Sequence, residues 1–369
     1  MHKVERALFE MRQGRALCVT GGDGWTVVAA VEGLGVDRLG QFRSLGGSLR
    51  LIVTQHRGEV MGLANADGSV LSLGLGVEAP DSILLLATAP GTPAVEMALR
   101  SDVRMASASE SSALSLARRG RLLPALVSTT VDSGTAELRR WLEEGAILDV
   151  SISEIERAAA HPGIEVTYVT EAPVPLADAE HSRFVFFRER GGFLEHVAVL
   201  IGARDGWPDP VPVRLHSACL TGDLFGSLRC DCGEQLRGSL RHFAARGGGV
   251  LIYLAQEGRG IGLGNKMRAY ALQEGGLDTV DADGTLGFGA DERRYDAAVA
   301  ILRDLDITQV QLLTNNPEKV RALEEGGIHV VERMPLHGGL NRHNLRYVQA
   351  KVDRSGHWLA DMISQPISE

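Results

Sequence analysis

The stretch VLIYLAQEGRGIGLGNKMRAYALQEGG, residues 250–276, contains a strand, a loop and a helix in the order of an α/β unit. The apolar residues 250–254 indicate a buried strand, and residues 255–266 form a glycine-rich loop. The helix that follows is expected to end at Gly275 and Gly276, because glycine commonly ends helices. Such a loop, together with the helix N-terminus, is suited to bind phosphate. The stretch therefore predicts an α/β fold whose functional residues lie in loops at the ends of strands and helices.

The glycine-rich loop matches no regular nucleotide-binding motif. The third glycine of G-x-G-x-x-G is replaced by Leu263, and Lys266 lacks the neighbours that a Walker A sequence requires. Alone, the loop fits tight packing as well as it fits phosphate binding. Cations at expected loops and helix starts in this half favour a polyphosphate ligand. They are Arg214, Arg259, Lys266, Arg268, Arg293 and Lys319.

The length of 369 residues indicates two domains. A proline-containing segment places the boundary near residue 170, which gives domains 1–170 and 171–369. Strand-like and helical patterns alternate in both, so we expect α/β (α+β mixed) domains, each a mixed sheet with flanking helices. In the first domain the strand-like runs are residues 16–20, 49–54, 82–88 and 122–130.

Three helix starts carry capping signals. Ser151 and Glu154 have the spacing of a capping box. Asp291 is expected to cap the next helix, and Asn316 precedes Pro317, which suits the first helical position.

The charge and the N-terminal sequence limit the class of partner. A net charge of −9 argues against binding nucleic acid through bulk charge, so a small partner is expected. The N-terminus lacks the apolar segment of a signal peptide, and no run of about 18 apolar residues predicts a membrane span. We therefore expect no membrane partner and a cytoplasmic location, where reduced thiols are the rule.

Three of the four cysteines, Cys219, Cys230 and Cys232, lie close together in the sequence. A disulfide is disfavoured in the cytoplasm, and no C-x-x-C redox motif is present. Three thiolates suit a catalytic zinc site that keeps its fourth position for water, whereas His216 as a fourth ligand would make the site structural. The competing interpretation is three cysteines in a core, but the polar residues between them favour metal.

A zinc nucleobase deaminase is excluded by the spacing. Those enzymes combine H-x-E with P-C-x-x-C, whereas this chain has His216-Ser217-Ala218 and a C-x-C pair, so the general acid/base is missing. The fourth cysteine, Cys18, lies in an apolar strand and is interpreted as a packing residue.

Four acidic residues near these motifs are candidates for proton transfer, for recognition of a base or for binding Mg²⁺, which prefers carboxylate and phosphate oxygens. They are Asp223, Asp231, Glu257 and Asp291.

With these residues in view, the second half of the chain resembles GTP cyclohydrolase II, which opens the imidazole ring of guanine in the first step of riboflavin synthesis. The resemblance covers about residues 180–369. It is carried, in order, by RLHSACLTGDLFGSLRCDCGEQL, QEGRGIGL, NKMRAYALQ, LGFGADERRY and LLTNNPEKV. It implies zinc-dependent hydrolysis of GTP to 2,5-diamino-6-(5-phosphoribosylamino)pyrimidin-4(3H)-one, formate and diphosphate.

The same resemblance implies the ligands of metal and substrate. Cys219, Cys230 and Cys232 would bind one Zn²⁺ per chain, whose water attacks guanine C8, and Mg²⁺ would accompany the triphosphate. The implied GTP site consists of Arg214, Leu215, His216, Ser217, Ala218, Gln235, Glu257, Gly258, Arg259, Thr314 and Lys319. A homodimer is also implied.

Three residues have catalytic roles by the same resemblance. Tyr270 orients the ring or water, Asp291 accepts a proton, and Arg293 is the nucleophile that takes the α-phosphate and releases pyrophosphate. A guanidinium is protonated far above neutral pH, so stabilising charge on the phosphoryl group is the easier chemistry for Arg293.

The chain departs from the family pattern at a few positions. Similar proteins typically have Glu at Ala218, Arg at Ala255, and EAN where residues 281–283 read DAD. None of these is a zinc ligand, so we expect substrate affinity to change more than the reaction. The departures also support an alternative, a zinc- and GTP-binding regulatory protein with little or no turnover.

The first half is similar to dihydroxybutanone phosphate synthase in position and in runs such as VERALFEMRQGRALCVT. The acidic DDEDRENEGD-type loop of that enzyme is replaced here by GGDGWTVVAAVEGL, residues 21–34. The loss of these carboxylates predicts a non-catalytic domain with a structural or regulatory role. Synthase activity of the first half is a third hypothesis.

Overall fold

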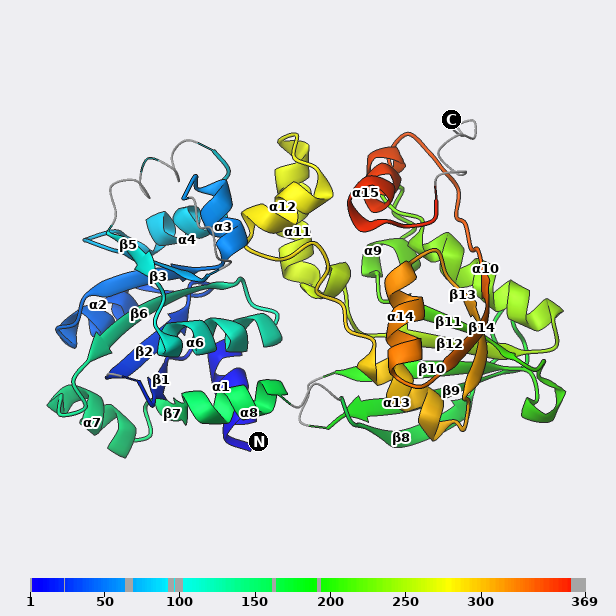
Figure 1. Ribbon diagram of the computed structural model, residues 1–369, viewed down its shortest axis with the longest axis horizontal. Coiled ribbons are helices and arrows are strands. Elements are labelled where there is room, and N and C mark those ends of the chain that lie inside the picture. The colour runs from blue at the N-terminus through cyan, green and yellow to red at the C-terminus, as the bar shows by residue number, and fades with distance from the viewer. Residues whose placement is uncertain are drawn as a thin grey trace. The chain divides into compact units, whose positions relative to one another are not determined.

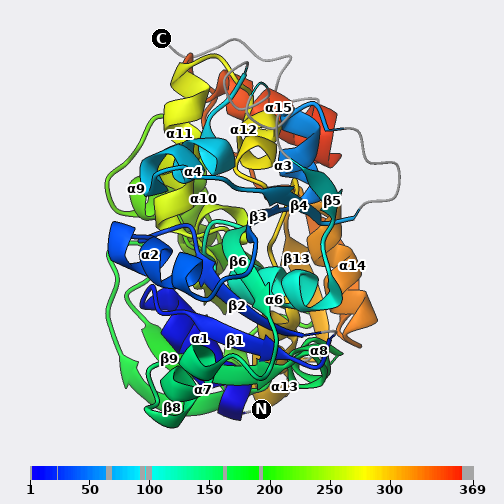
Figure 2. The ribbon, with the colours of Figure 1, turned by 90° about the vertical axis from the view of Figure 1, so that its left-hand side faces the viewer.

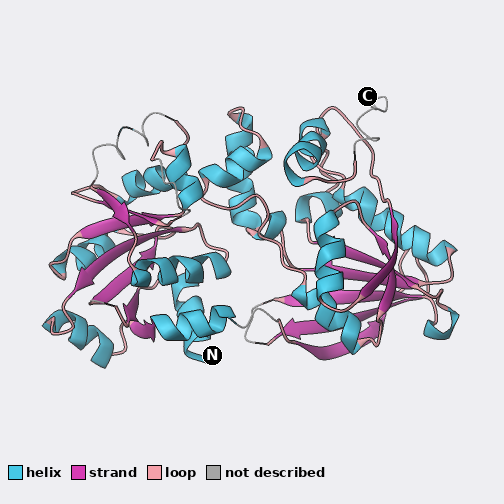
Figure 3. Ribbon diagram, in the orientation of Figure 1, coloured by secondary structure: helices cyan, strands magenta, loops and turns pink. Residues whose placement is uncertain are grey.

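The computed structural model describes residues 2–22, 24–63, 69–91, 96, 102–160, 164–190 and 194–359. The chain folds into two compact units, each made of two separate segments (Figure 1). The N-terminal unit comprises Met1–His161 with Gly264–Glu292, and the C-terminal unit comprises Pro162–Leu263 with Arg293–Glu369. Each contains a seven-stranded mixed sheet with helices beside it, which confirms the expected fold class (Figure 3). The domain limits 1–170 and 171–369 stay a prediction.

The sheet of the N-terminal unit is antiparallel except for one pair at its edge, β1 with β7. In order across the sheet, its strands are β5 (Val103–Met105), β4 (Leu71–Gly74), β3 (Leu49–Val53), β6 (Ala125–Val131), β2 (Trp25–Ala30), β1 (Leu17–Thr20) and β7 (Leu148–Ser151). Its helices are α1 (His2–Arg12), α2 (Val36–Ser44), α3 (Gln55–Val60), α4 (Pro80–Thr88), α6 (Ala108–Arg119), α7 (Ala136–Glu143), α8 (Ile152–Ala160), α11 (Leu263–Glu274) and α12 (Thr279–Thr285).

The main core of this unit lies between the sheet and α1, α6 and α8. Val4, Ala7, Leu8 and Met11 of α1 follow a helical repeat and are all buried. They join apolar residues of β1, β2 and β3 in one core, and Figure 2 shows α1 and α6 beside β1 and β2. Cys18 is fully buried in β1, as expected of a packing residue.

The sheet of the C-terminal unit has a parallel half, from β14 to β12, and an antiparallel half, from β12 to β8. In order across the sheet, its strands are β14 (His329–Met334), β13 (Gln309–Leu313), β11 (Val211–Ser217), β12 (Gly249–Leu254), β10 (Glu195–Ile201), β9 (Ser182–Glu189) and β8 (Val166–Pro173). Its α-helices are α9 (Leu220–Asp223), α10 (Cys232–Ala245), α13 (Asp296–Asp304), α14 (Pro317–Glu325) and α15 (Leu345–Ser355), with short 3-10 helices at Arg204–Gly206 and Gly258–Gly260.

The two faces of this sheet differ in what covers them. Val213 and Leu215 of β11 pack in a core with α13 and α14. Side chains alternate between the faces of a strand, so Arg214 and His216 lie on the opposite face, where α10 packs. The alternation places two polar side chains of one strand on the same face.

The strands β11, β12 and β13 are parallel, so their carboxyl ends meet at one edge of the sheet. The cysteine stretch follows β11, the glycine-rich loop follows β12, and Thr314 follows β13. In α/β folds, ligands commonly bind at this edge.

The structure differs from the sequence prediction in two segments. Residues 82–88 belong to the helix α4 and not to a strand: Pro80 occupies a first helical position, and Ile83, Leu86 and Ala87 are buried. A short apolar run does not distinguish a strand from a buried helix. The segment expected to join the domains contains β8, which pairs with β9.

The capping predictions were right at two of three helix starts. Ser151 and Glu154 exchange hydrogen bonds at the start of α8, and the Asn316 side chain accepts from the Glu318 backbone N–H in α14. Asp291 does not cap α13, which begins at Asp296, because the Arg294 backbone N–H donates to the Gln256 side chain.

The described helices include none that is long and apolar enough to span a membrane.

Candidate functional site

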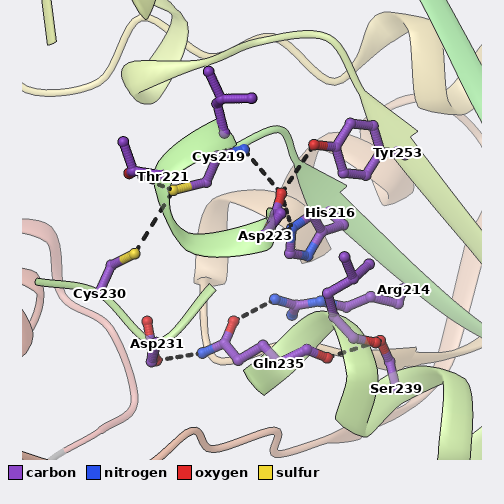
Figure 4. Close-up of polar contacts among 12 residues, drawn as sticks. Arg214, His216, Cys219, Thr221, Asp223, Cys230, Asp231, Gln235, Ser239 and Tyr253 are labelled. Carbon is purple, nitrogen blue, oxygen red and sulfur yellow. Dashed lines mark hydrogen bonds and ion pairs between the residues drawn. The ribbon is translucent and has the colours of Figure 1, made fainter. Parts of the chain in front are cut away.

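The three clustered cysteines come together where β11 ends. Cys219 precedes α9, Cys230 lies in the next loop, and Cys232 begins α10. Their Sγ atoms lie within 4.8 Å of one another, and those of Cys219 and Cys230 are 3.7 Å apart (Figure 4). Tetrahedral thiolate ligands at a Zn–S distance of about 2.3 Å are about 3.8 Å apart. The donor set and its spacing therefore fit a zinc ion.

Gly222 makes the approach of the thiols possible. A Cβ at this position would lie 2.7 Å from Cys230 Sγ and 3.2 Å from Cys219 Sγ. At Gly233, a Cβ would lie 2.2 Å from the carbonyl oxygen of Gly222. At both positions a side chain would clash, because Gly222 lies against the thiols and Gly233 lies against the backbone of Gly222.

The thiols also affect one another's ionisation. The hydrogen bond with Cys219 raises the pKa of Cys230 to about 11, and the neighbouring thiols raise the pKa of Cys232. Without a cation these side chains are therefore protonated at neutral pH. Metals bind the thiolate form, so metal binding would release protons.

Asp223, the last residue of α9, links the cysteine stretch to the sheet. Its carboxylate accepts hydrogen bonds from the Cys219 backbone N–H and from the Tyr253 hydroxyl, both at 2.9 Å (Figure 4). It also lies 3.0 Å from Nε2 of His216, whose ring stacks on Tyr253 with centroids 5.5 Å apart. Burial lowers the pKa of His216, so a neutral ring donates from Nε2. His216 is thus held by Asp223, and the group of candidate metal ligands contains thiols alone.

A second chain of hydrogen bonds begins at Asp231, between two of the cysteines. Its carboxylate accepts from Gln235 Nε2 at 2.5 Å and from Lys351 Nζ at 3.1 Å. The other end of the Gln235 amide accepts from Arg214 Nη2 at 2.5 Å (Figure 4). Arg214 Nη1 donates to the Leu313 carbonyl at 2.9 Å. Arg214 is therefore a buried strand residue with a fixed orientation; we expected it in a loop.

The glycine-rich loop is tied to the cysteine stretch through Glu257. Its carboxylate accepts from the backbone N–H of Leu220 at 2.6 Å and of Gly258 at 2.8 Å. Arg259 has a φ of 57°, in the left-handed region that a non-glycine residue rarely adopts. Such strain persists where the surrounding structure fixes it, commonly at functional sites. The Arg259 guanidinium lies 5.8 Å from the ring centroid of Tyr347 on α15.

Lys319 and Thr314 belong to the same edge of the sheet. Lys319, on α14, is 4% exposed and donates to the Leu215 carbonyl at 2.6 Å. Thr314 is buried after β13, and its hydroxyl accepts from the Asn316 backbone N–H at 3.0 Å. Two basic side chains, Arg214 and Lys319, thus contact adjacent parallel strands.

Two buried polar atoms of this network have no hydrogen-bond partner in the described part of the chain. They are Nε of Arg214 and Nδ1 of His216. Most buried polar groups in proteins are paired, so unpaired ones in a group of functional side chains point to a ligand. One is a donor and the other, in the neutral ring, an acceptor, which suits a polar ligand with both kinds of group.

The remaining predicted residues divide between the two units. Ser217 Oγ accepts from Gln256 Nε2 at 3.0 Å, and the Ala218 backbone N–H donates to the Leu254 carbonyl at 2.8 Å. Tyr270 and Asp291 belong to the N-terminal unit, and Arg293 begins the second segment of the C-terminal unit. Arg268, expected near phosphate, lies within α11 and pairs with Glu32.

Two residues of the network, Tyr253 and Lys351, were not predicted. Tyr253 lies in the apolar run VLIYL, where its hydroxyl was a usable signal, since a buried tyrosine usually finds a hydrogen-bond partner. Lys351 offered no such signal, because it is 120 positions from Asp231 in the sequence.

Comparison with known proteins identifies the family. A model described as GTP cyclohydrolase II matches residues 167–335. A protein named GTP cyclohydrolase-2 from Azospirillum brasilense is 41% identical over 362 residues, which are 97% of this chain and 94% of that protein. The chain belongs to the GTP cyclohydrolase II family. The predicted resemblance of the second half and the assignment to a family of hydrolases are confirmed.

Other relatives match over shorter lengths. The riboflavin biosynthesis protein RibBA of Phocaeicola vulgatus is 42% identical over 259 residues, 67% of this chain and 62% of that protein. A GTP cyclohydrolase-2 of Pseudomonas aeruginosa is 50% identical over 200 residues, 54% of this chain and 96% of that protein. The solved structure of RibBX, a two-domain 3,4-dihydroxy-2-butanone 4-phosphate synthase from A. baumannii, covers 91% of this chain at 15% identity, with a TM-score of 0.34.

Proposed function

We propose that this chain is a zinc-dependent GTP cyclohydrolase II. It would hydrolyse GTP to 2,5-diamino-6-(5-phosphoribosylamino)pyrimidin-4(3H)-one, formate and diphosphate in riboflavin biosynthesis. The observation that carries the proposal is the group of three thiols at the spacing of zinc ligands, beside the unpaired atoms of Arg214 and His216. The relatives named GTP cyclohydrolase-2 support the substrate, and the relative named RibBA supports the pathway.

In this proposal Cys219, Cys230 and Cys232 hold one zinc ion per chain. The bound ion would supply a water of lowered pKa for attack on guanine C8. Asp223 keeps Cys219 in place through its backbone N–H, as groups around metal ligands commonly do. The fourth position is left to water or substrate, because His216 is hydrogen-bonded to Asp223.

The substrate would lie along the edge formed by β11, β12 and β13. Arg214 and Lys319 supply positive charge there, and Mg²⁺ would accompany the triphosphate. The proposed GTP site keeps the predicted residues, namely Arg214, Leu215, His216, Ser217, Ala218, Gln235, Glu257, Gly258, Arg259, Thr314 and Lys319. The proposal includes a homodimer, which light scattering tests, and a cytoplasmic location.

The catalytic roles are proposed for three residues. Tyr270 orients the ring or water, and Asp291 accepts a proton. Arg293 stabilises charge on the α-phosphate as diphosphate leaves, because a guanidinium remains protonated and donates several hydrogen bonds.

The experiment that tests the proposal measures formate and diphosphate released from GTP by the purified chain with Zn²⁺ and Mg²⁺. Cys230→Ser should lose bound zinc and lower kcat by about 100-fold or more, because one of three metal ligands is weakened. Cys18→Ser is the matched control, since it removes a buried thiol in β1 and should keep both zinc and turnover.

Two results would reject the proposal. One is equal formate release by the wild type and Cys230→Ser. The other is tight GTP binding by zinc-loaded protein without formate over hours, which would favour the regulatory alternative that Ala218 and Ala255 suggest.

A further inference from the structure

The segment Gly264–Glu292 has an unusual position in the fold. It lies inside the residues matched by the GTP cyclohydrolase II model, 167–335, yet it packs with the N-terminal unit. The rest of that unit, Met1–His161, precedes the match. The segment carries Tyr270 and Asp291, so two proposed catalytic residues belong to a unit whose other part lies outside the family match.

Arg57 of α3 links the segment to the rest of the unit. It is 1% exposed, and its guanidinium makes four hydrogen bonds to three backbone carbonyls. Two bonds go to Leu86, at 2.9 and 3.0 Å, one to Ala89 at 2.8 Å, and one to Thr285 at 2.9 Å.

These carbonyls lie at the C-terminal ends of two helices. Leu86 and Ala89 belong to the end of α4, and Thr285 is the last residue of α12. Carbonyls at a helix C-terminus have no partner within the helix, and the helix dipole favours a cation there. Arg57 therefore caps one helix from each segment of the unit. Burial lowers the pKa of this guanidinium to about 10, which leaves it charged at neutral pH.

Thr54, immediately before α3, adds a second buried link. Its hydroxyl donates to the Gly287 carbonyl at 2.7 Å. A Cβ at Gly287 would lie 3.0 Å from Thr54 Oγ1 and 3.1 Å from Pro124 Cγ, and the φ of Gly287 is 86°. The backbone of the segment thus approaches Thr54 more closely than a side chain at 287 would permit.

The ends of the segment are held as well. Asn265 Nδ2 donates to the Arg121 carbonyl at 3.2 Å, near the start of α11. At the other end, Glu292 pairs with Arg118 at 2.7 Å. The second pair is exposed and contributes little. Arg268 within the segment also pairs with Glu32, and the bonds of Arg57 and Thr54 are the fully buried ones among these links.

We propose that Arg57 and Thr54 are positioning residues for the cyclohydrolase reaction, because they fix the segment that carries Tyr270 and Asp291. The inference rests on the proposed function. It gives the N-terminal unit a structural role in catalysis without chemistry of its own. The Pseudomonas relative, of which 96% matches 200 residues of this chain, has little length left for such a unit, so the dependence belongs to the long chains.

Hydrogen exchange of the full chain without GTP tests the anchor itself. Arg57→Met should raise exchange rates at least about tenfold at amides of 264–292, because the buried Thr285 carbonyl at the end of α12 loses its donor. Arg50→Met is the matched control. Arg50 is also buried, and within the described residues its hydrogen bonds go to Ser72 and Asp102, outside the segment. Faster exchange after Arg50→Met should stay near β3, β4 and Asp102.

Steady-state kinetics with GTP test the catalytic consequence. Arg57→Met should lower kcat by about 10- to 100-fold and change KM by less than about threefold, since misplaced catalytic groups affect turnover more than binding. Arg50→Met should keep kcat within about twofold at a temperature where both variants are folded.

If Arg57→Met does not fold, Thr54→Val replaces it as the test variant. Thr54→Ser, which keeps the hydroxyl, is its conservative counterpart, and Thr26→Val at another buried threonine is the control. Thr54→Val should increase exchange in 264–292 and lower kcat, and Thr54→Ser should restore both. Unchanged exchange in 264–292, or the same increase in the control, would overturn the inference. If the wild type releases no formate, the proposed function fails, and the exchange result still decides whether the anchor exists.

Discussion

Gly222 tests how closely the thiols must approach. Gly222→Ala would place a methyl carbon 2.7 Å from Cys230 Sγ, well inside van der Waals contact. We expect the affinity for zinc to fall by about 10- to 100-fold, the range seen when the surroundings of metal ligands are disturbed. Competition with a chromophoric chelator measures it. Gly238→Ala is the control, since its Cβ would meet only Leu336, at 3.9 Å. Equal zinc affinity in the two variants would show that the thiols need no such clearance.

Asp223 tests the hydrogen bonds around Cys219. Three donors point at its carboxylate: the Cys219 N–H, the Tyr253 hydroxyl and Nε2 of His216. Asp223→Asn replaces one acceptor oxygen by a donor, so at least one of them loses its partner. We expect weaker zinc retention, by about tenfold or more, and a lower kcat. Asp178→Asn, which breaks only an exposed pair with Arg241, should change neither. Retention of zinc equal to the wild type would contradict the role of Asp223.

At the scale of residues, the candidate metal ligands could be predicted from the sequence, but the hydrogen-bond partners of the residues around them could not. The spacing of Cys219, Cys230 and Cys232 indicated a metal site without a structure. Asp223 and Asp231 were candidates for proton transfer, but their carboxylates bond Tyr253 and Lys351 in the fold. Such partners depend on which strands and helices become neighbours, which no local pattern specifies.

At the scale of elements, predictions were right where a local signal was strong. The capping residues Ser151 and Asn316 mark the true starts of α8 and α14. The apolar run at 82–88 is helical because tertiary packing decides between helix and strand in short apolar segments. Asp291 is a residue type that commonly caps helices, but the Arg294 backbone N–H bonds the distant Gln256 side chain, and α13 begins only at Asp296.

The helix α15 contributes to the site from beyond the residues of the family match, which end at 335. Lys351 Nζ lies 3.1 Å from Asp231 Oδ1, and their side chains are 12% and 1% exposed. Lys351→Met would leave the buried Asp231 carboxylate without its ion-pair partner, so the free energy of unfolding should fall by about 3–5 kcal/mol. Urea unfolding measures it. Lys351→Arg should recover most of the loss, and Gln349→Ala, on an exposed position of α15, should cost little.

The ion pair also predicts a pH dependence. Burial raises the pKa of Asp231, but Lys351 outweighs this and brings the pKa below the ordinary 3.8. A carboxylate with a lowered pKa stabilises the fold above its unfolded pKa, and this contribution is lost as the pH falls through the folded value. The difference in unfolding free energy between the wild type and Lys351→Met should therefore be constant near neutrality and shrink in acid. A difference that grows in acid would rule out the ion pair as its source.

At the scale of the molecule, the order of the sequence hides how the units are composed. The motif strings follow one another from 214 to 320 as if in one domain, yet Gly264–Glu292 packs with the first 161 residues. The bonds of Arg57 and Thr54 to Thr285 and Gly287 span more than 200 positions. Long-range contacts of this kind have no signature in periodicity or composition.

The N-terminal unit is expected to lack synthase activity. The buried carboxylate of Glu110 accepts hydrogen bonds from Ser72, Ser128 and Arg104. Within the described residues, the three thiols of the C-terminal unit are the only group of at least three possible metal ligands.

The purified chain with Mg²⁺ should therefore form no four-carbon phosphate from ribulose 5-phosphate above the rate without protein, while an active synthase in parallel does. The same sample should release formate from GTP, which shows that the protein is folded. The four-carbon phosphate, detected by mass spectrometry at a rate that scales with protein concentration, would contradict this prediction. Its formation by Glu110→Gln at an unchanged rate would then place the chemistry away from Glu110, a fully buried carboxylate of this unit.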